Sequence, residues 1–331
     1  MGRDKQDAHM TSISRSILTQ EYEKFQKEWL SSETTIQAHT SGSTGIPKQI
    51  LLAKNDMLNS AKATNRFFGI DRHSYLFSPL SANYVAGKMM YVRAYEAACT
   101  FISESPSNMP LKKLPDGIER IDLMCVVPSQ AENLLNNDLT KKHVKNVIVG
   151  GAPMTERLET QLSGMPWNTY VTYGMTETCS HVALRKAGSQ VYNALPGIQF
   201  STDRRNCLII SAPAFSFGTL VTNDVVHIES PTSFKWIGRY DNVINSGGIK
   251  FCPEELEFLL AKELPVPFYI HKVPHDKWGE AVGLTLEDPH NKIPTETILG
   301  ICRNLLPRYA VPSVINRVAE LPRTANGKLR R

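Results

Sequence analysis

The stretch from residue 122 to residue 162 restricts the fold of this chain more than any other part of the sequence. In two short runs, 122–127 and 146–149, every residue after the first is apolar, which predicts a buried strand for the first run and a strand for the second. Each run is followed by a segment with helical spacing of its apolar residues, at 129–136 and 155–162. Alternating strands and helices are typical of a sheet covered by helices. The sequence therefore predicts an α/β fold class for this part of the chain.

The flanking segments extend this prediction in both directions. On the N-terminal side we expect a helix at 16–30, strands at 34–40 and 50–53, and a helix at 55–68 that is capped by Asn55 or Asp56. On the C-terminal side we expect shorter strands at 207–211, 219–221, 225–229 and 235–237, then a helix at 253–262, strands at 268–273 and 283–286, and a helix at 296–305. These patterns predict a large α/β domain over 1–238 and a small α+β domain over 242–331. The boundary is expected at 239–242, in a polar stretch next to a glycine.

Length and composition agree with this organisation. A chain of 331 residues exceeds one typical domain. Hydrophobic residues make up 41% and charged residues 21%, which is ordinary for a globular protein. The 37 basic and 32 acidic residues leave a net charge of +5, a mild excess that suits an enzyme handling anions. Because no block rich in lysine and arginine occurs, a nucleic-acid partner is not expected.

The cysteines and the N-terminus bear on the compartment. The six cysteines are scattered, without a C-x-x-C pair or a histidine at zinc spacing, so reduced thiols are expected. The first 16 residues lack the apolar stretch of a signal peptide. No window approaches the roughly 20 apolar residues of a membrane helix. We therefore expect a soluble, cytoplasmic protein without a membrane partner.

A loop rich in glycine and hydroxyl residues lies between the two predicted N-terminal strands. It reads Thr40-Ser41-Gly42-Ser43-Thr44-Gly45-Ile46-Pro47-Lys48. Glycines let backbone N–H groups approach an anion closely, hydroxyl groups add donors, and Lys48 adds positive charge. The loop does not match the pattern G-x-x-x-x-G-K-[ST]. A flexible linker would not explain its place between two apolar strands, so we interpret it as a phosphate-binding loop.

A second motif follows an apolar strand and reads Tyr170-Val171-Thr172-Tyr173-Gly174-Met175-Thr176-Glu177. Its turn displays an aromatic ring, a hydroxyl group and a carboxylate. These groups suit a purine face, a phosphate and a phosphate-bound Mg²⁺, respectively. Alone, the motif is also compatible with a turn around a buried tyrosine. Together with the first loop, it indicates a nucleotide site.

In this order, the two motifs resemble those of the superfamily of acyl- and aryl-CoA synthetases, luciferase-like enzymes and peptide-synthetase adenylation domains. Later segments continue the resemblance: Gly150-Gly151-Ala152-Pro153, Thr222-Asn223-Asp224, Gly238-Arg239-Tyr240-Asp241, Ser246-Gly247-Gly248-Ile249-Lys250 with Pro253-Glu254-Glu255-Leu256-Glu257 after it, and Pro322-Arg323-Thr324-Ala325-Asn326-Gly327-Lys328. Because the segments keep the order of the superfamily from residue 40 to residue 328, the chain is identified as a member of it.

The resemblance implies an enzyme that uses ATP and Mg²⁺ to form an acyl-adenylate from a carboxylic acid, and that then passes the acyl group to the thiol of coenzyme A. It also implies that the small domain moves about the hinge residue Asp241 between these half-reactions, with Lys328 serving the first. The implied catalytic residues are Lys328, Thr176 and Glu177, with Glu177 as the metal ligand. The implied ATP-binding residues are Thr40, Ser41, Gly42, Ser43, Thr44, Gly45, Lys48, Gly151, Ala152, Pro153, Tyr173, Gly174, Met175, Asp224 and Arg239, and those of the coenzyme A face are Ser246, Gly247, Gly248 and Lys250.

Two stretches, 84–93 and 173–180, resemble one subgroup, the o-succinylbenzoate–CoA ligases of menaquinone synthesis. The implied acyl-site residues are Tyr84, Gly87, Lys88, Arg93 and Ser180. The substrate of that subgroup carries a second carboxylate, which a cation such as Lys88 or Arg93 suits. Surface charge on a helix is an equally good interpretation of either cation alone. Residues 78–88 contain no Asp or Glu, which argues against a substrate with an ammonium group.

Some features depart from the superfamily pattern. Only 39 residues precede Thr40, so we expect part of the usual layering to be reduced and an apolar face to be left for a partner subunit, for example in a homodimer. Asn223 replaces the usual glycine, and Asn83-Tyr84 stands where many relatives have histidine. Other functions remain open: another aryl- or acyl-CoA ligase, an adenylation enzyme that loads a carrier protein, and an inactive nucleotide-binding relative.

Overall fold

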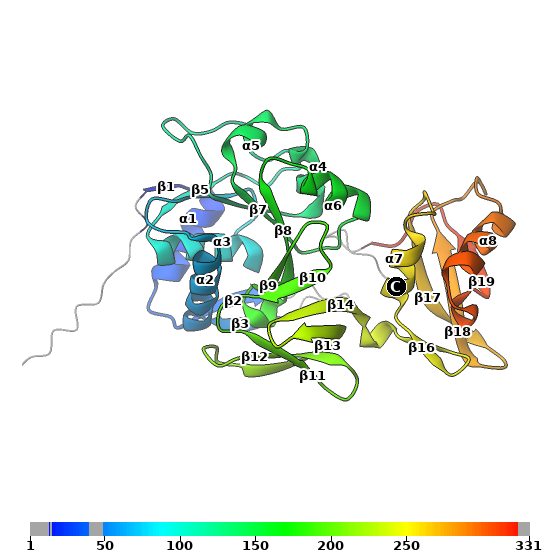
Figure 1. The fold of residues 1–331 in the computed structure, drawn as a ribbon. Helices are drawn as coiled ribbons and strands as arrows, with labels where there is room; N and C mark the ends of the chain where they lie inside the picture. Colours follow the sequence, from blue (N-terminus) through cyan, green and yellow to red (C-terminus); the bar gives the residue numbers. More distant parts are fainter. Residues whose placement is uncertain (1–12, 14, 40–48, 324–331) are drawn as a thin grey trace, which may run out of the picture.

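The computed structural model describes residues 13, 15–39 and 49–323, and every structural statement below refers to these residues. Its largest unit is a twelve-stranded sheet with the order β1-β5-β4-β6-β7-β8-β9-β10-β14-β13-β12-β11 (Figure 1). The first half contains β1 (Arg15–Ile17), β5 (Thr100–Ser103), β4 (Tyr75–Ser78), β6 (Leu123–Val126), β7 (Asn146–Val149) and β8 (Asn168–Gly174). Neighbours in this half pair in parallel.

Helices cover both faces of the parallel half. The helices are α1 (Gln20–Leu30), α2 (Lys54–Phe68), α3 (Val85–Ala97), α4 (Pro128–Leu134), α5 (Asp138–His143) and α6 (Glu156–Ser163). Because successive side chains of a strand point to opposite faces, Leu76 and Phe101 pack with residues of α1, α2 and α3. Their neighbours Phe77 and Ile102 pack with residues of α4 and α6. This arrangement of three layers confirms the predicted α/β fold class.

The second half of the sheet is antiparallel. It contains β9 (His181–Lys186), β10 (Val191–Ala194), β14 (Ser233–Arg239), β13 (Gly218–Ser230), β12 (Cys207–Ala212) and β11 (Gln199–Thr202). The prediction of separate strands at 219–221 and 225–229 is wrong, because β13 runs without a break through both. Asp224, which lies between them, pairs with Arg239 of β14.

Other predicted elements also differ from the structure. The helix expected at 16–30 begins only at Gln20, because the residues before it form β1 alongside β5. Neither Asn55 nor Asp56 caps α2, which begins one residue earlier, after Ala53. Asp56 instead accepts a hydrogen bond from the backbone N–H of Ser216 at 2.9 Å. Helix α3 has no amphipathic pattern to predict it, because most of its residues are buried.

Two smaller sheets complete the fold. Strands β2 (Thr35–His39) and β3 (Gln49–Ala53) form an antiparallel pair next to α2. The C-terminal sheet contains β15 (Ile244–Ser246), β16 (Ile249–Phe251), β17 (Phe268–His275), β18 (Gly279–Leu286) and β19 (Val314–Arg317), and it packs with α7 (Pro253–Leu260) and α8 (Thr295–Leu305) around its own apolar core. This unit lies beside the antiparallel half of the large sheet (Figure 1). The domain boundary at 239–242 stays a prediction.

An ion pair links the C-terminal unit to the large sheet in this arrangement. Nζ of Lys262, just after α7, lies 3.3 Å from Oε1 of Glu156 in α6. Both side chains are largely exposed, so the pair contributes little to the free energy of unfolding. Among the described residues, no helix has the length and apolar character needed to cross a membrane.

Candidate active site

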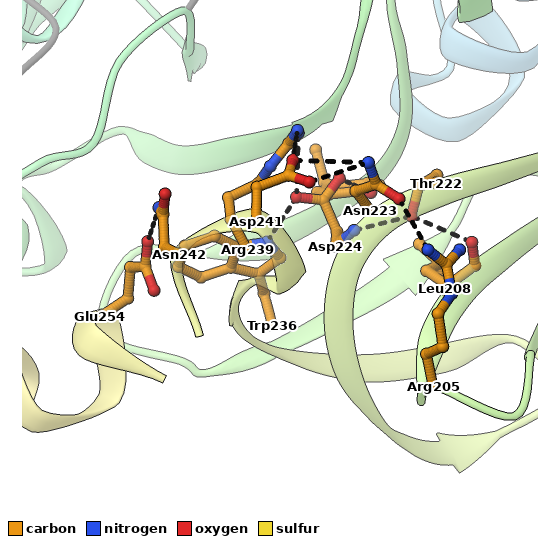
Figure 2. A network of polar contacts seen from close by, with 11 residues as sticks. Arg205, Leu208, Thr222, Asn223, Asp224, Trp236, Arg239, Asp241, Asn242 and Glu254 are labelled. Atoms are coloured by element: carbon orange, nitrogen blue, oxygen red, sulfur yellow. Dashed lines mark hydrogen bonds and ion pairs between the residues drawn. The ribbon is translucent and has the colours of Figure 1, made fainter. Parts of the chain in front are cut away.

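The centre of the candidate site is the carboxylate of Asp224 on β13, which is almost fully buried. The hydroxyl group of Tyr173 donates a hydrogen bond to its Oδ2 atom at 2.8 Å. The indole N–H of Trp236 donates to its Oδ1 atom at 3.2 Å (Figure 2). The backbone N–H of Asp224 is itself bonded to Oγ1 of Thr222 at 3.0 Å. The first two contacts fix the orientation of the carboxylate, and the third fixes the backbone that carries it.

Arg239 and Asp241 complete this group. Nη1 of Arg239 lies 3.7 Å from Oδ1 of Asp224, because the two residues face each other across β13 and β14. The other end of the guanidinium, Nη2, lies 2.9 Å from Oδ2 of Asp241, and Asn223 also donates to that carboxylate (Figure 2). The structure therefore brings together residues of three separate sequence motifs: Tyr173, Asp224, and the pair Arg239 and Asp241.

Burial determines the protonation state of Tyr173. Desolvation, followed by the nearby Asp224 carboxylate, raises the pKa of the Tyr173 hydroxyl well above its ordinary value of 10.0. The hydroxyl group therefore stays protonated and remains a donor at all physiological pH values.

The other neutral donor, Trp236, was missed in the sequence analysis. Its place in the strand predicted at 235–237, two residues before the Gly238-Arg239 motif, was the only signal.

The turn after β8 displays Thr176 and Glu177. Gly174 is required at its start, because a Cβ atom there would lie 2.2 Å from the carbonyl oxygen of Ser180. Thr178 holds the turn closed, since its Oγ1 atom accepts from the backbone N–H of Met175 at 3.0 Å and donates to the carbonyl oxygen of Ser180 at 2.6 Å. Cys179 follows with φ 61°, a strained conformation for a residue with a side chain. Strain of this kind is common where a turn presents functional groups.

The chemistry of Glu177 suits a magnesium ion that is already bound to phosphate. Its side chain is exposed, and it makes no hydrogen bond or ion pair to the residues that the structure describes. Those residues also contain no group of three or more His, Cys, Asp and Glu side chains that would hold a metal by themselves. Mg²⁺ is usually held by one or two carboxylates and by substrate phosphates. Glu177 therefore fits a metal that enters with a nucleotide.

The segment after β7 approaches the same edge of the sheet. A Cβ atom at Gly150 would lie 2.3 Å from Oγ1 of Thr172 on β8, so any larger residue there would displace the Thr172 side chain. Gly151 follows with φ 87°, in the region that favours glycine. Ala152 and Pro153 continue as partly exposed chain. Ligands of parallel sheets bind at the carboxyl ends of the strands, and these residues lie at such ends.

The two cations of the proposed acyl site are buried, so the interpretation as surface charges is wrong. Nζ of Lys88 lies 3.0 Å from Oε2 of Glu28 and 4.3 Å from the ring centre of Phe25, both on α1. Arg93 is 1% exposed. Gly87, which precedes both cations on α3, is required for close contact, because a Cβ atom would lie 2.1 Å from the carbonyl oxygen of Ser81. Tyr84, at the start of the helix, is 54% exposed.

Neutral groups surround the guanidinium of Arg93. Its Nη2 atom donates to Oγ of Ser180 at 2.7 Å and lies 3.5 Å from Nδ1 of His181. Its Nη1 atom donates to the sulfur of Met90 at 3.4 Å. Nε makes no hydrogen bond, and Arg93 forms no ion pair within the described ranges. Burial lowers the pKa of Arg93 only to about 10, so the group is charged at neutral pH.

His181 belongs to this group, although its place after Ser180 was the only hint of it in the sequence. Its Nε2 atom lies 3.1 Å from Oγ1 of Thr64 on α2. Burial, followed by the charge of Arg93, lowers the pKa of His181 well below its ordinary value of 6.5. The ring is therefore neutral at pH 7 and adds no second positive charge beside Arg93.

Comparison with known proteins decides the family. The profile described as AMP-binding enzyme matches residues 5–202, which is more than half of the chain. The chain belongs to the AMP-binding enzyme family. This result confirms the superfamily expected from the motifs.

Curated members of the AMP-binding family extend the comparison over nearly the whole chain. The 2-succinylbenzoate–CoA ligase of Bacillus pumilus is 24% identical over 93% of this chain and 70% of its own length. The 2-succinylbenzoate–CoA ligase of Listeria monocytogenes (serovar 1/2a) is 23% identical over 92% of this chain and 70% of its own length. The indoleacetate–CoA ligase of Aromatoleum aromaticum is 27% identical, over 88% of this chain and 65% of its own length.

Solved structures of the family share the fold. An acyl-CoA synthetase (AMP-forming)/AMP-acid ligase II-like protein from Dyadobacter fermentans is 32% identical, with a TM-score of 0.61 over 93% of this chain and 91% of that one. The o-succinylbenzoate coenzyme A synthetase of Bacillus subtilis, solved with ATP and a magnesium ion, has a TM-score of 0.75 at 19% identity. The match covers 89% of this chain and 68% of the Bacillus subtilis protein. At 19% identity, it supports only the fold.

The residues expected to face coenzyme A lie in the C-terminal sheet of this AMP-binding enzyme. Gly247 and Gly248 form the turn between β15 and β16, with φ values of 61° and 81°. A Cβ atom at Gly247 would lie 2.5 Å from the ring of Tyr309, so the turn packs directly on that ring. Ser246 is fully buried, whereas Lys250 is exposed.

Other expected residues of the AMP-binding site fall outside the described ranges. They are Thr40, Ser41, Gly42, Ser43, Thr44, Gly45 and Lys48 of the phosphate-binding loop, and the catalytic Lys328. The strands on either side of that loop are described. The register of β2 and β3 pairs His39 with Gln49. The roles of these residues stay predictions.

Proposed function

We propose that this chain is an ATP-dependent acid–thiol ligase that forms an acyl-adenylate and then an acyl-CoA thioester. Membership of the AMP-binding family carries this proposal, and the curated CoA ligases that cover most of the chain support it. In the first step, a carboxylate oxygen of the acid attacks the α-phosphorus of ATP, and the bond from that phosphorus to pyrophosphate breaks. In the second step, the sulfur of the deprotonated thiol attacks the acyl carbon, and AMP leaves.

The described residues supply binding and orientation for the first step. Asp224 would accept hydrogen bonds from the ribose hydroxyl groups, and Tyr173 and Trp236 hold its carboxylate in place for this task. Thr176 would donate to a phosphate oxygen. Glu177 would hold Mg²⁺, which when bound neutralises charge on the phosphates. Preorganised donors matter here because two anions must approach each other.

The C-terminal sheet would serve the second step. Rotation about Asp241 would replace Lys328 at the site by the turn that contains Gly247 and Gly248. This proposal includes the domain division at 239–242. The exposed ion pair between Lys262 and Glu156 is the kind of weak contact that such a rotation can break at small cost.

The acid that we propose is o-succinylbenzoate, or an aromatic acid with a second carboxylate of the same kind. The charge of Arg93 is the observation that supports it. An isolated buried charge is costly, and a partner anion repays that cost. Among the described residues, Lys88 has such a partner in Glu28, whereas Arg93 has only neutral contacts. A carboxylate brought by the substrate would supply the missing negative charge.

A second candidate is an aromatic monocarboxylic acid, because the indoleacetate–CoA ligase is also similar over most of the chain. The single carboxylate of a monocarboxylic acid is the group that reacts with ATP. It therefore leaves no negative charge to pair with Arg93. The buried guanidinium therefore favours the dicarboxylic acid.

Pyrophosphate release across a panel of carboxylic acids tests the proposal. The panel should contain o-succinylbenzoate, its analogue without the distal carboxylate, indoleacetate and several amino acids. We expect the highest kcat/KM with o-succinylbenzoate. Coenzyme A and a phosphopantetheinyl carrier protein are then compared as acceptors, and a thioester only on the carrier would contradict the second half of the proposal. If no acid in the panel causes pyrophosphate release, the chain is a nucleotide-binding relative without ligase activity.

A further inference from the structure

We propose that helix α1 is a specificity element of the acyl site, in which Tyr22, with Glu21 and Glu28, positions the segment 78–93 and thereby Arg93. The inference rests on the proposed function, because it assigns to α1 the recognition of the distal carboxylate. Tyr22, Glu21 and Glu28 are positioning residues, since each acts through α3 or through the loop before it. Nothing in the motifs of the sequence indicated a role for α1.

Tyr22 ties together the two ends of the segment that precedes Arg93. It is fully buried, and its hydroxyl group lies 2.7 Å from Oγ of Ser78, at the end of β4. The same hydroxyl group donates to the carbonyl oxygen of Gly87, in the first turn of α3, at 3.1 Å. Gly87 is needed for this approach too, because a Cβ atom there would lie 3.0 Å from the hydroxyl oxygen. Burial also raises the pKa of Tyr22, so it stays a protonated donor.

Glu21 holds the loop between those two ends. Its Oε2 atom accepts from Oγ of Ser81 at 2.6 Å and from the backbone N–H of Ala82 at 3.1 Å. Ser81 is also the residue whose carbonyl oxygen packs against Gly87. One side chain of α1 therefore fixes the loop, and the next side chain fixes the start of α3.

Glu28 holds α3 one turn before Arg93. Its contact with Lys88 crosses 60 positions of the sequence and is shielded on one side by Phe25. Phe25 also packs edge-on against Tyr91, with ring centres 5.5 Å apart. Lys88 is consequently occupied as an anchor of α3. This leaves Arg93, among the described cations of α3, to face a ligand.

The contacts of α1 with the segment 78–93 matter for specificity because the guanidinium of Arg93 contacts only neutral groups. Its two nitrogens bind Ser180 and Met90, and neither contact fixes the guanidinium as an acidic partner would. The position of the charge therefore depends on the position of the helix backbone. A shift of about 1 Å in such a group is enough to weaken recognition.

Tyr22→Phe tests this inference, because it removes one hydroxyl group and keeps the ring in the core. We expect the KM for the preferred dicarboxylic acid to rise about five-fold, as for loss of a buried hydrogen bond. The KM for ATP and for the analogue without the distal carboxylate should stay unchanged. The matched control is Leu162→Val, which opens a gap on the opposite face of the sheet. It should lower Tm without changing the ratio of the two kcat/KM values.

A charge swap tests the part played by Glu28. Glu28→Lys and Lys88→Glu should each reduce the preference for the dicarboxylic acid, and the double variant should restore it. If Lys88 touched the substrate, the double variant would remain defective. If both single variants kept the preference of the native enzyme, Glu28 would have no positioning role.

The failure of this inference differs from the failure of the proposed function. A native enzyme that does not prefer any dicarboxylic acid contradicts the proposed substrate and, with it, the specificity role of α1. If the native enzyme has that preference and Tyr22→Phe lowers Tm without changing the preference, only the role of α1 is contradicted. Hydrogen exchange gives a readout independent of turnover: backbone amides of 84–93 should exchange faster in Tyr22→Phe and not in Leu162→Val. Equal exchange in the native protein and Tyr22→Phe would overturn the positioning.

Discussion

Tyr173 and Asp224 touch through a hydrogen bond of 2.8 Å, although three strands lie between their own strands in the sheet. In a flat sheet, four strand spacings of about 4.8 Å would place β8 and β13 about 19 Å apart. Neither side chain can span such a gap. The sheet must therefore curl between its parallel and antiparallel halves, which brings a residue from each half to one carboxylate.

Removal of the Tyr173 hydroxyl group should weaken ATP binding. In Tyr173→Phe the Asp224 carboxylate loses one of its two neutral donors, and we expect the KM for ATP to rise about ten-fold, as for a hydrogen bond to a charged group. Tyr192→Phe is the control, because Tyr192 belongs to the same aromatic group, with its ring centre 5.8 Å from that of Tyr173. Equal effects of both variants on the KM for ATP would assign the loss to packing rather than to Asp224.

Glu177→Gln should shift the dependence on magnesium. The amide keeps the shape of the side chain but loses the charge, so the Mg²⁺ concentration for half-maximal pyrophosphate release should rise on the order of ten-fold. The exposed Glu132 of α4 provides the control, since Glu132→Gln should leave this titration unchanged. Unfolding temperatures should be the same for all three proteins. An unchanged titration in Glu177→Gln would remove this residue from the metal site.

Arg93→Met and Lys88→Met should have different consequences. Loss of the Arg93 charge should raise the KM for the dicarboxylic acid roughly ten- to a hundred-fold, as for a charge-assisted contact, and barely affect the monocarboxylic analogue. Lys88→Met leaves Glu28 without its partner and should lower Tm, and it should reduce the preference for the dicarboxylic acid less than Arg93→Met does. Steady-state kinetics with both acids distinguish these results. Equal losses for the two acids in Arg93→Met would make the arginine a purely structural residue.

Asp241→Pro should separate the two half-reactions. Proline fixes φ near −65° and restricts rotation of the chain at this position. We expect thioester formation from supplied acyl-adenylate and adenylate formation from ATP to be affected very unequally. Asp241→Asn is the control, because it keeps the backbone free and removes only the charge that faces Arg239. If proline slowed both half-reactions equally, the chain would not pivot at residue 241.

The buried His181 should make stability depend on pH below neutrality. Its pKa is well below 6.5 in the folded protein, so the unfolded chain binds a proton that the folded chain does not. Stability should therefore be lost as the pH falls below the unfolded value of about 6.5, with a slope of about 1.4 kcal/mol per pH unit. His181→Gln should reduce this slope between about pH 5 and 6.5. Denaturant unfolding across that range measures it, and an unchanged slope would contradict the assignment.

The local patterns of the chain determined the family and much of the α/β half. Largely apolar runs such as 146–149 predict strands, because a strand covered on both faces needs mostly apolar side chains. Glycines at fixed places in the motifs, such as Gly174, also follow local rules, since a Cβ atom there would clash with the turn itself. Periodicity and turn chemistry act over a few residues, and a sequence displays them directly.

Tertiary structure alone decided which of these residues meet. Asp224 and Tyr173 come together because the sheet curls, and no local pattern reports curvature summed over several strands. Lys88 and Arg93 look alike in the sequence, five positions apart on a helix without amphipathic character. They differ only because Glu28 of α1 reaches Lys88, whereas the groups around Arg93 are neutral. Whether a buried charge is paired depends on partners far along the chain, and those partners are chosen by packing.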